Sequence, residues 1–145
     1  MSLEDLAYPV LRLNERGVRK ARRPADLRLM PQPYFAAGGF QGGSFIIDSS
    51  CRKYEVLEIR ALRRSYNLTY LITGKHRMYV VDYELGPPVQ LSFVEARATV
   101  IDLIVRKRWY GQGGETRAKF VARLEACSSM PELMATQEGY GTVWY

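Results

Sequence analysis

The segment MYVVDYELGPPVQLSFVEARATVIDLIVR, residues 78–106, contains the change of pattern that decides the fold. Before Ser92, apolar and polar residues tend to alternate, which is typical of strands with one buried face. After Ser92, apolar residues recur three and four positions apart, which is typical of amphipathic helices. The sequence therefore predicts an α+β fold, in which an antiparallel sheet at about 44–91 is covered by C-terminal helices at about 93–139.

Four or five strands joined by hairpins account for the alternating region. Asp48-Ser-Ser-Cys51 supplies a turn, because its polar side chains bond their own backbone. In the strand that returns from this turn, the apolar phase slips between Val56 and Leu57, which predicts a β-bulge there. The expected strands are 44–48, one that begins at Lys53, 68–72, 78–85 and a short extended piece at 89–91.

The helical region contains three expected helices. Ser92 and Glu95 form a capping box, so the first helix starts at Phe93. The core stripe expected on it is Val94, Ala98, Ile101, Val105 and Trp109, widened by Phe93, Val100 and Ile104. The second helix starts at Glu115 and places on one face Phe120, Val121, Leu124 and Cys127. The third repeats the capping box with Ser129 and Glu132 and is expected to run to Gly139.

Shorter elements flank this core in what we expect to be a single domain, residues 1–145. Ser2 caps a short N-terminal helix over residues 3–7. Leu11 and Leu13 alternate with Arg12 in a short strand, and Pro24 opens a single helical turn. The glycine-rich stretch 36–43 is expected to be a loop. The apolar tail 140–145 is expected to dock on the core or to add an edge strand.

The composition, with 47% hydrophobic and 25% charged residues, is that of a soluble globular protein. No apolar run approaches the ~20 residues that span a bilayer, so we expect no membrane segment. The N-terminus is acidic and lacks a basic stretch followed by an apolar one, so we expect no secretory signal. Cys51 and Cys127 show no metal-ligand spacing, which favours a reduced, cytoplasmic setting.

The net charge of +6 is unevenly distributed along the chain. Residues 11–28 and 51–77 each contain seven basic and two acidic residues. Such asymmetry indicates one basic face and a partner that is acidic or that bears phosphates. The alternative explanation is a solvated basic surface without a dedicated partner.

Chemically reactive side chains are scarce, and we expect no enzyme, no metal and no cofactor. The only histidine, His76, lies in an expected turn between two cations, which disfavour a protonated imidazole. Asp82 and Glu84 share one strand face, but alternation places that face in solvent. The stretch 38–43 lacks the Gly-Lys-Ser/Thr ending of a phosphate-binding loop, and a strand follows it rather than a helix. We therefore assign no catalytic residue.

Five short patterns form a series along the chain: Phe45–Ser49, Tyr54-x-Val56, Gly86-Pro-Pro, Leu91–Ala96 and Trp109-Tyr110. The series is similar to that of a loose group of small bacterial proteins, many of which accompany polymorphic or secreted toxins as immunity proteins. This chain departs from the pattern at Cys51, where a glycine usually makes the turn. The resemblance implies that the protein binds and inhibits a cognate toxin or effector.

The leading hypothesis is therefore a non-enzymatic protein-binding module, of the immunity type, whose partner has an acidic surface. Arginine side chains make good interface anchors, and complementary charge speeds the encounter of two proteins. The residues that we expect to contact the partner are Arg19, Lys20, Arg22, Arg23, Arg63 and Arg64, with Phe40 and Tyr66 as aromatic anchors.

The alternative hypothesis is a regulatory protein that binds nucleic acid or a cyclic dinucleotide. Arg19 and Arg23, read as R-x-x-x-R, and Asp48-x-Ser50 resemble the signature of PilZ-type cyclic-dinucleotide receptors, with Lys53 in place of the expected glycine. Planar guanidinium groups bind phosphates as well as carboxylates. The tyrosines near Arg63 would allow stacking on nucleic-acid bases.

Overall fold

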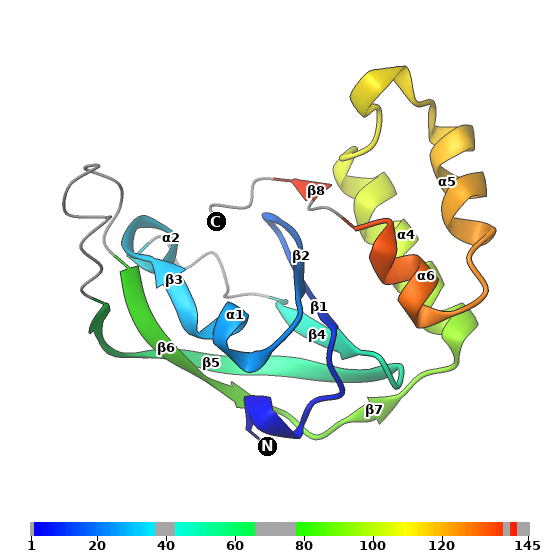
Figure 1. The fold of residues 1–145 in the computed structure, drawn as a ribbon. Helices are drawn as coiled ribbons and strands as arrows, with labels where there is room; N and C mark the ends of the chain where they lie inside the picture. Colours follow the sequence, from blue (N-terminus) through cyan, green and yellow to red (C-terminus); the bar gives the residue numbers. More distant parts are fainter. Residues whose placement is uncertain (1, 37–42, 66–77, 138–139, 142–145) are drawn as a thin grey trace.

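A computed structural model describes residues 2–36, 43–65, 78–137 and 140–141 of the chain (Figure 1). Within them the chain forms a curled antiparallel sheet and a group of C-terminal helices, so the expected α+β class is confirmed. The strands are β1 (Val10–Asn14), β2 (Gly17–Ala21), β3 (Leu29–Pro31), β4 (Phe45–Asp48), β5 (Arg52–Ser65), β6 (Met78–Leu85), β7 (Val89–Gln90) and β8 (Tyr140–Gly141). The helices are η1 (Leu3–Asp5), α1 (Pro24–Arg28), α2 (Gln32–Ala36), α4 (Phe93–Lys107), η2 (Gln112–Gly114), α5 (Arg117–Glu125) and α6 (Met130–Ala135).

The sheet is larger than the four or five strands expected between residues 44 and 91. Its strand order is β3-β6-β5-β4-β1-β2-β8, with β7 paired to β5, and the described pairs are antiparallel. The additional strands come mostly from the N-terminal third, where Arg19 and Lys20 interrupt the apolar pattern of β2. β5 pairs directly with β6 over most of its length. The expected strand 68–72 lies outside the described residues.

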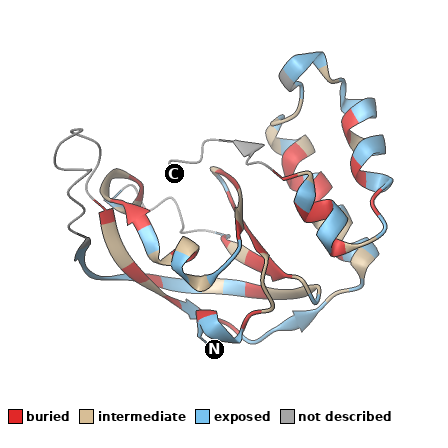
Figure 2. Cartoon of the chain, in the orientation of Figure 1, coloured by how far each residue is buried: buried red, intermediate tan, exposed pale blue. Residues whose placement is uncertain are grey.

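β1 lies in the middle of the sheet, and all five of its residues are buried. Leu11 and Leu13 join a core cluster with the helices, whereas Val10 joins a second cluster inside the curl. Figure 2 shows buried residues along β1 and on the side of α4 that meets α6. Because both faces of β1 are covered, Arg12 and Asn14 are buried as well, with 2% and 4% of their surface exposed.

α4 begins as the sequence predicts, and the side that it buries agrees in part with the expected one. The Glu95 N–H donates to Ser92 Oγ at 3.1 Å, and the Ser92 N–H donates to the Glu95 carboxylate at 3.1 Å. The expected core stripe is wrong at Val94, which is 60% exposed, and at Ala98, which is exposed too. Its other members are confirmed: Val100, Ile101 and Ile104 are buried, and partly buried side chains pack against the same core at Phe93, Val105 and Trp109. The buried residues are Ala96, Val100, Ile101, Leu103 and Ile104. Apolar residues surround most of this helix, so their spacing alone does not identify the side that meets the sheet.

The remaining C-terminal elements follow the sequence more closely. Phe120, Leu124 and Cys127 are buried, as expected. α6 ends at Ala135 and not at Gly139, because the Gln137 N–H bonds the Met134 carbonyl three residues back and tightens the last turn. β8 pairs with β2, which confirms an edge strand within the expected tail 140–145. The described helices include none that is long and apolar enough to cross a bilayer.

Asp48, which is fully buried, ties the turn between β4 and β5 to the N-terminal segment. Its Oδ2 accepts hydrogen bonds from the Ala7 N–H at 3.2 Å and from Arg52 Nε at 3.1 Å. Its Oδ1 accepts from the N–H groups of Ser50 at 2.9 Å and Arg52 at 3.0 Å. The expected turn is confirmed, and Cys51 completes it in the left-handed backbone region with φ of 62°. One carboxylate therefore holds two distant segments together.

Asp48→Asn is expected to lower the free energy of unfolding by about 2–4 kcal/mol, because an amide cannot accept all of these bonds or pair with the Arg52 guanidinium. Urea unfolding followed by circular dichroism measures the change. The matched control is Glu58→Gln, since Glu58 is half-exposed and lies 3.9 Å from Arg60. This control is expected to change stability by less than about 0.5 kcal/mol. Equal losses in the two variants would contradict the role given to Asp48.

Candidate functional site

Arg12 is an arginine buried at the centre of β1, and it faces the inside of the curled sheet. Its Nη1 donates a hydrogen bond to the hydroxyl of Tyr83 in β6 at 3.0 Å. Its Cζ lies 5.5 Å from the centroid of the Tyr34 ring in α2. Since a guanidinium group is attracted to the face of an aromatic ring, Arg12 links β1 to β6 and to α2 across the interior.

The Tyr34 ring contacts a second guanidinium group, that of Arg16, whose Cζ lies 5.6 Å from the ring centroid. Asn14 sets this geometry. Its Oδ1 accepts hydrogen bonds from the N–H groups of Arg16 at 2.8 Å and Gly17 at 3.1 Å, which shapes the turn between β1 and β2. Its Nδ2 donates to the Tyr34 hydroxyl. One asparagine thus positions both the ring and the arginine that covers it.

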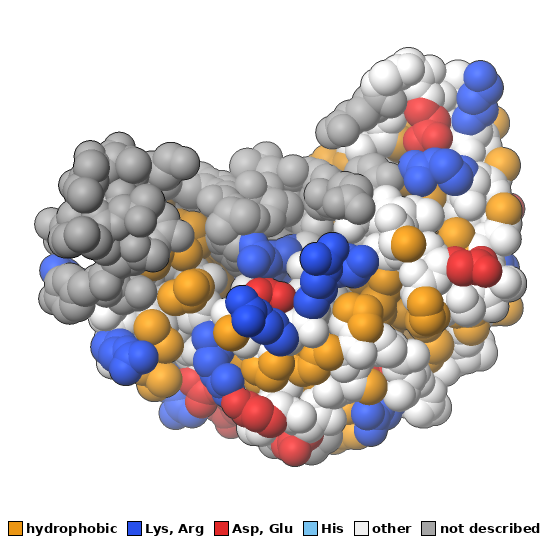
Figure 3. Space-filling model, in the orientation of Figure 1, with side chains coloured by type: hydrophobic (Ala, Val, Ile, Leu, Met, Phe, Trp, Pro, Cys, Tyr) orange, Lys and Arg blue, Asp and Glu red, His pale blue; other side chains and the backbone are white. Residues whose placement is uncertain are grey.

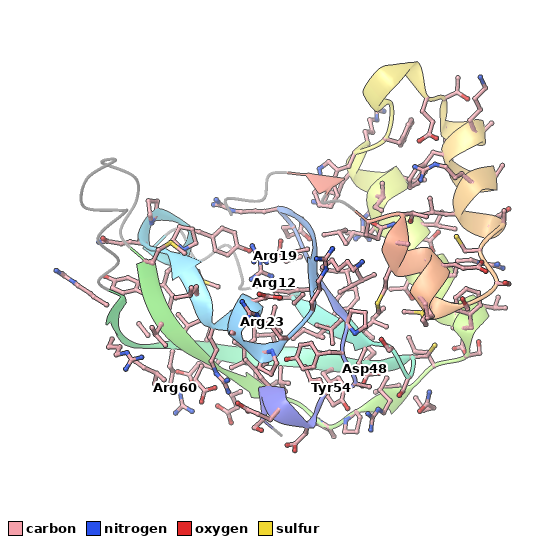
Figure 4. The ribbon with its side chains drawn as sticks, viewed as in Figure 1. Arg12, Arg19, Arg23, Asp48, Tyr54 and Arg60 are labelled. Carbon is pink, nitrogen blue, oxygen red and sulfur yellow. The ribbon has the colours of Figure 1, made fainter. Side chains whose placement is uncertain are left out.

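Arg19 stands directly opposite Arg12 in the pairing of β1 with β2. Its Nη2 donates to the carbonyl of Asp26 in α1 at 3.1 Å. The Asp26 carboxylate accepts from the Arg22 N–H at 2.9 Å and from Arg23 Nε at 3.4 Å. Partial burial raises the pKa of Asp26, but these hydrogen bonds outweigh it and hold that pKa below its usual value. Figure 4 shows Arg12, Arg19 and Arg23 gathered beside α1.

Positive charge is therefore concentrated inside the curl and at its rim. We name the group inside it the interior cluster, which consists of Arg12, Asn14, Arg16, Arg19, Tyr34 and Tyr83. Figure 3 shows basic side chains grouped in the middle of this face of the molecule. Guanidinium groups held in this way suit carboxylate or phosphate oxygens.

The structure separates the predicted contact residues into two groups. Arg19 belongs to the interior cluster, whereas Lys20 lies opposite Leu11 in β1 and is half-buried. Arg22 and Arg23 are exposed just after β2. The second group, Arg63 and Arg64, is exposed on β5. In the sheet, β4 and β1 lie between β5 and β2, so the two groups are on separate strands. The two predicted aromatic anchors, Phe40 and Tyr66, lie outside the described residues.

β5 exposes two leucines through breaks in its pairing with β6. The register shifts between Val56 and Glu58 and again between Ala61 and Arg63. Leu57 and Leu62 are the extra residues at these two bulges, so the bulge expected near Val56-Leu57 is confirmed. Leu57 is 55% exposed and Leu62 is 62% exposed.

Arginines flank these leucines along β5. Arg60 lies 3.9 Å from the carboxylate of Glu58. Arg63 and Arg64 are exposed, and within the described part of the chain neither forms an ion pair. We name this exposed stretch of the strand the β5 patch, which consists of Leu57, Arg60, Leu62, Arg63 and Arg64. Since successive side chains of a strand alternate, Arg63 and Arg64 lie on opposite faces of it.

In the described ranges, the acidic and sulfur-bearing side chains form no group of three or more that could hold a metal ion. Asp82 and Glu84 lie on the outer face of β6, opposite Arg60 and Glu58, while Tyr83 between them is buried. This confirms the face expected for that pair. Cys51 and Cys127 are free thiols, and burial raises the pKa of the Cys51 thiol.

The interior cluster contains residues that the sequence did not single out. Arg12 lies between Leu11 and Leu13, and simple alternation places it in solvent when the leucines are buried. Because both faces of β1 are covered, Arg12 is buried in spite of this alternation. The available signal was Asn14, whose position before Arg16-Gly17 is typical of a tight turn and predicts a hairpin partner for β1. That partner, β2, brings Arg19 opposite Arg12.

Comparisons with protein-family models, with curated proteins and with solved structures found no match to this chain.

Tyr83→Phe is expected to lower the free energy of unfolding by about 1.5–3 kcal/mol, because Arg12 stays buried and loses a hydrogen-bond acceptor. Chemical denaturation monitored by tryptophan fluorescence measures it. Tyr79→Phe on the same strand is the control: Tyr79 packs edge-on against Phe35, and its hydroxyl has no described hydrogen bond. We expect the control to stay within about 0.5 kcal/mol of the parent. A Tyr83 variant as stable as the control would show that Arg12 does not need this acceptor.

Proposed function

We propose that this chain is a non-catalytic protein-binding module that docks a partner with an acidic surface on the β5 patch. The observation that carries the proposal is the pair of bulges on β5, which put Leu57 and Leu62 in solvent beside three arginines. A partner that covers these leucines would remove apolar surface from water, and arginine is enriched among the residues that dominate protein interfaces.

The charges around the patch favour a protein over a nucleic acid. Glu58, Asp82 and Glu84 lie on the same outer face as Arg60. Acidic side chains repel phosphates, whereas a protein surface can match both signs of charge. At the far end of β5, Arg63 and Arg64 add positive charge without an ion pair in the described ranges. A partner with mainly acidic residues at that end is therefore complementary.

The resemblance of residues 44–110 to immunity-type proteins adds the kind of partner to this proposal. A toxin or effector that the chain inhibits by covering its active surface fits a small domain with an exposed, charged strand. Complementary charge would also speed their association, which an inhibitor of a toxic enzyme requires.

The proposal is tested by affinity capture with the full chain and two pairs of matched variants. Leu62→Asp and Arg63→Glu alter the β5 patch, whereas Val94→Asp and Arg117→Glu change exposed residues on α4 and α5. A specific partner is expected to be retained by the parent and by the helix variants, and to be lost about tenfold or more with the patch variants. Equal recovery with all variants, or no specific partner, would overturn the proposal.

Co-expression then tests inhibition. The captured protein, or the product of a toxin-like reading frame adjoining the gene, is expressed in bacteria together with each variant. The parent and Val94→Asp are expected to restore growth, and Leu62→Asp is expected to fail. A partner that is not toxic, or toxicity that the parent leaves unchanged, would argue against the immunity role while leaving protein binding in place.

The interior cluster favours a second candidate function, the binding of a phosphate-bearing ligand such as a nucleotide. Arg12 and Arg19 stand directly opposite each other, and like charges in that position repel. An anionic group beside them would be stabilised by both guanidinium groups. In the second element of the PilZ-type signature, Asp48-x-Ser50, the Asp48 carboxylate already accepts hydrogen bonds from its own chain and adds no ligand group.

This second function predicts a salt-dependent rise in thermal stability with a cyclic dinucleotide or a labelled oligonucleotide. The melting temperature of the parent is expected to increase with ligand, less at higher salt because counterions compete. Arg19→Gln is expected to abolish the increase, and Arg117→Glu to retain it. No shift for the parent at millimolar ligand would remove this candidate.

A further inference from the structure

We propose that the outer face of β5 and β6 receives an amphipathic helix of the partner, which places basic side chains at Leu57 and acidic side chains at Leu62. This inference rests on the proposed function and specifies the shape of the partner and the order of its charges. The outer face is the side of the two strands that points away from the interior cluster.

The pairing of β5 with β6 defines which side chains share this face. Tyr83 is buried inside the curl, so its neighbours Asp82 and Glu84 point outward. Directly opposite them on β5 stand Arg60 and Glu58, respectively. The side chains of Arg60 and Glu58 are 59% and 53% exposed, and Figure 4 shows Arg60 apart from the arginines inside the curl. The two cross-strand pairs thus form the middle of a face that is exposed to solvent.

Leu57 lies at one end of this face. Tyr54 is buried inside the curl, so the next residue, Glu55, points outward. A methyl group at Gly86 would lie 3.7 Å from Glu55 Cβ and 3.8 Å from Leu57 Cδ2, so these two side chains flank the same glycine on the outward side. The exposed Leu57 therefore belongs to the outer face.

Leu62 lies at the other end of the face. Ala61 stands opposite Val81, which is buried inside the curl, so the neighbour of Val81, Val80, points outward. Leu62 and Arg63 together oppose Val80, since two residues oppose one at a β-bulge. Leu62, which is 62% exposed, therefore shares the outer face with Arg63.

The charges change sign along this face. Three exposed carboxylates lie at the Leu57 end, those of Glu55, Glu58 and Glu84. Glu58 and Glu84 stand directly opposite each other, where like charges repel, so a cation placed between them would be stabilised by both. These carboxylates form no group that could hold a metal ion, which favours the ammonium or guanidinium group of a partner. At the other end, Arg63 suits a carboxylate of the partner.

A helix suits this face because helices already cover the same side of the sheet elsewhere. Ile46 stands opposite Tyr54 and joins the cluster inside the curl, whereas Ile47 joins the cluster that contains α4, α5 and α6. Those helices therefore pack on the outward side of the sheet. Leu57 and Leu62 are about 16 Å apart along β5, which is the rise of about eleven residues, or three turns, of a helix. Leucines at that spacing on one helix face would contact both.

Titration of the full chain with synthetic peptides, followed by the NMR signals of its backbone amides, tests the inference. The probe is a helical peptide of about eighteen residues with two leucines about eleven positions apart. Arginines flank one leucine, and glutamates flank the other. One control peptide replaces the arginines with glutamates, and a second replaces the glutamates with arginines. A third has a central proline, which breaks the helix.

The probe is expected to shift the amide signals of residues 57–63 and 80–84, and to bind about tenfold or more tightly than each control. Glu84→Lys is expected to transfer this preference to the peptide with glutamates at both ends, because it removes the acidic pair. Glu125→Lys, an exposed change on α5, is expected to leave the preference unchanged. Equal binding of the probe and its controls, or no binding at millimolar peptide, would overturn the inference. So would an unchanged preference in Glu84→Lys.

The captured partner separates this inference from the proposed function. If capture depends on Leu62 but not on Glu84, and the peptides bind alike, the protein-binding function stands and the inferred helix and charge order are wrong. If the probe binds as expected while capture yields no specific partner, the outer face binds helices as inferred and the proposed function fails.

Discussion

The burial of β1 on both faces is the constraint on which the rest of the structure depends. Helices cover one face through Leu11 and Leu13, and the curl of the sheet encloses the other. A strand in that position has no solvent side to which a charged residue can turn. Arg12 must therefore find its partners inside the protein, and it finds them in Tyr83 and Tyr34. The elements that carry these two tyrosines are held against β1 as a result.

The same curl separates two kinds of arginine. Those of β1, β2 and their turn face inward and contact rings, hydroxyls and carbonyl groups. Arg60, Arg63 and Arg64, toward the far end of β5, are exposed to solvent. The first group stabilises the shape, whereas the second is exposed on the surface. The topology of the sheet thus decides which arginines are enclosed and which are exposed.

Much of the architecture after residue 44 could be predicted from sequence because its signals are local. The Ser92-Glu95 capping box, the turn at Asp48 and the bulge at Leu57 are each specified within a few residues. The limits of β6 agree with the predicted strand for the same reason. The buried side of α4 was predicted only in part: Ile101 and Ile104 are buried as expected, but the exposure of Val94 depends on where the rest of the core lies.

In the N-terminal part of the sheet, β1 agrees with the short strand expected at Leu11 and Leu13, but β2 and β3 were not predicted. β2 carries Arg19 and Lys20 in sequence, and its place in the sheet depends on hydrogen bonds from β1 and on packing from both faces. Of the predicted contact residues, Arg63 and Arg64 belong to the patch now proposed, while Arg19 faces inward. Composition could indicate a basic surface, but only the fold separates exposed arginines from enclosed ones.

The contacts of Tyr34 affect how the protein unfolds. Its ring lies beneath Arg12 and Arg16, and its hydroxyl accepts from Asn14, so α2 is joined to the tip of a hairpin twenty residues earlier in the chain. Fraying of that tip must expose the ring, and loss of the ring must release the guanidinium group at the sheet's centre. Segments with little stability of their own thus melt together with the core, as one cooperative unit.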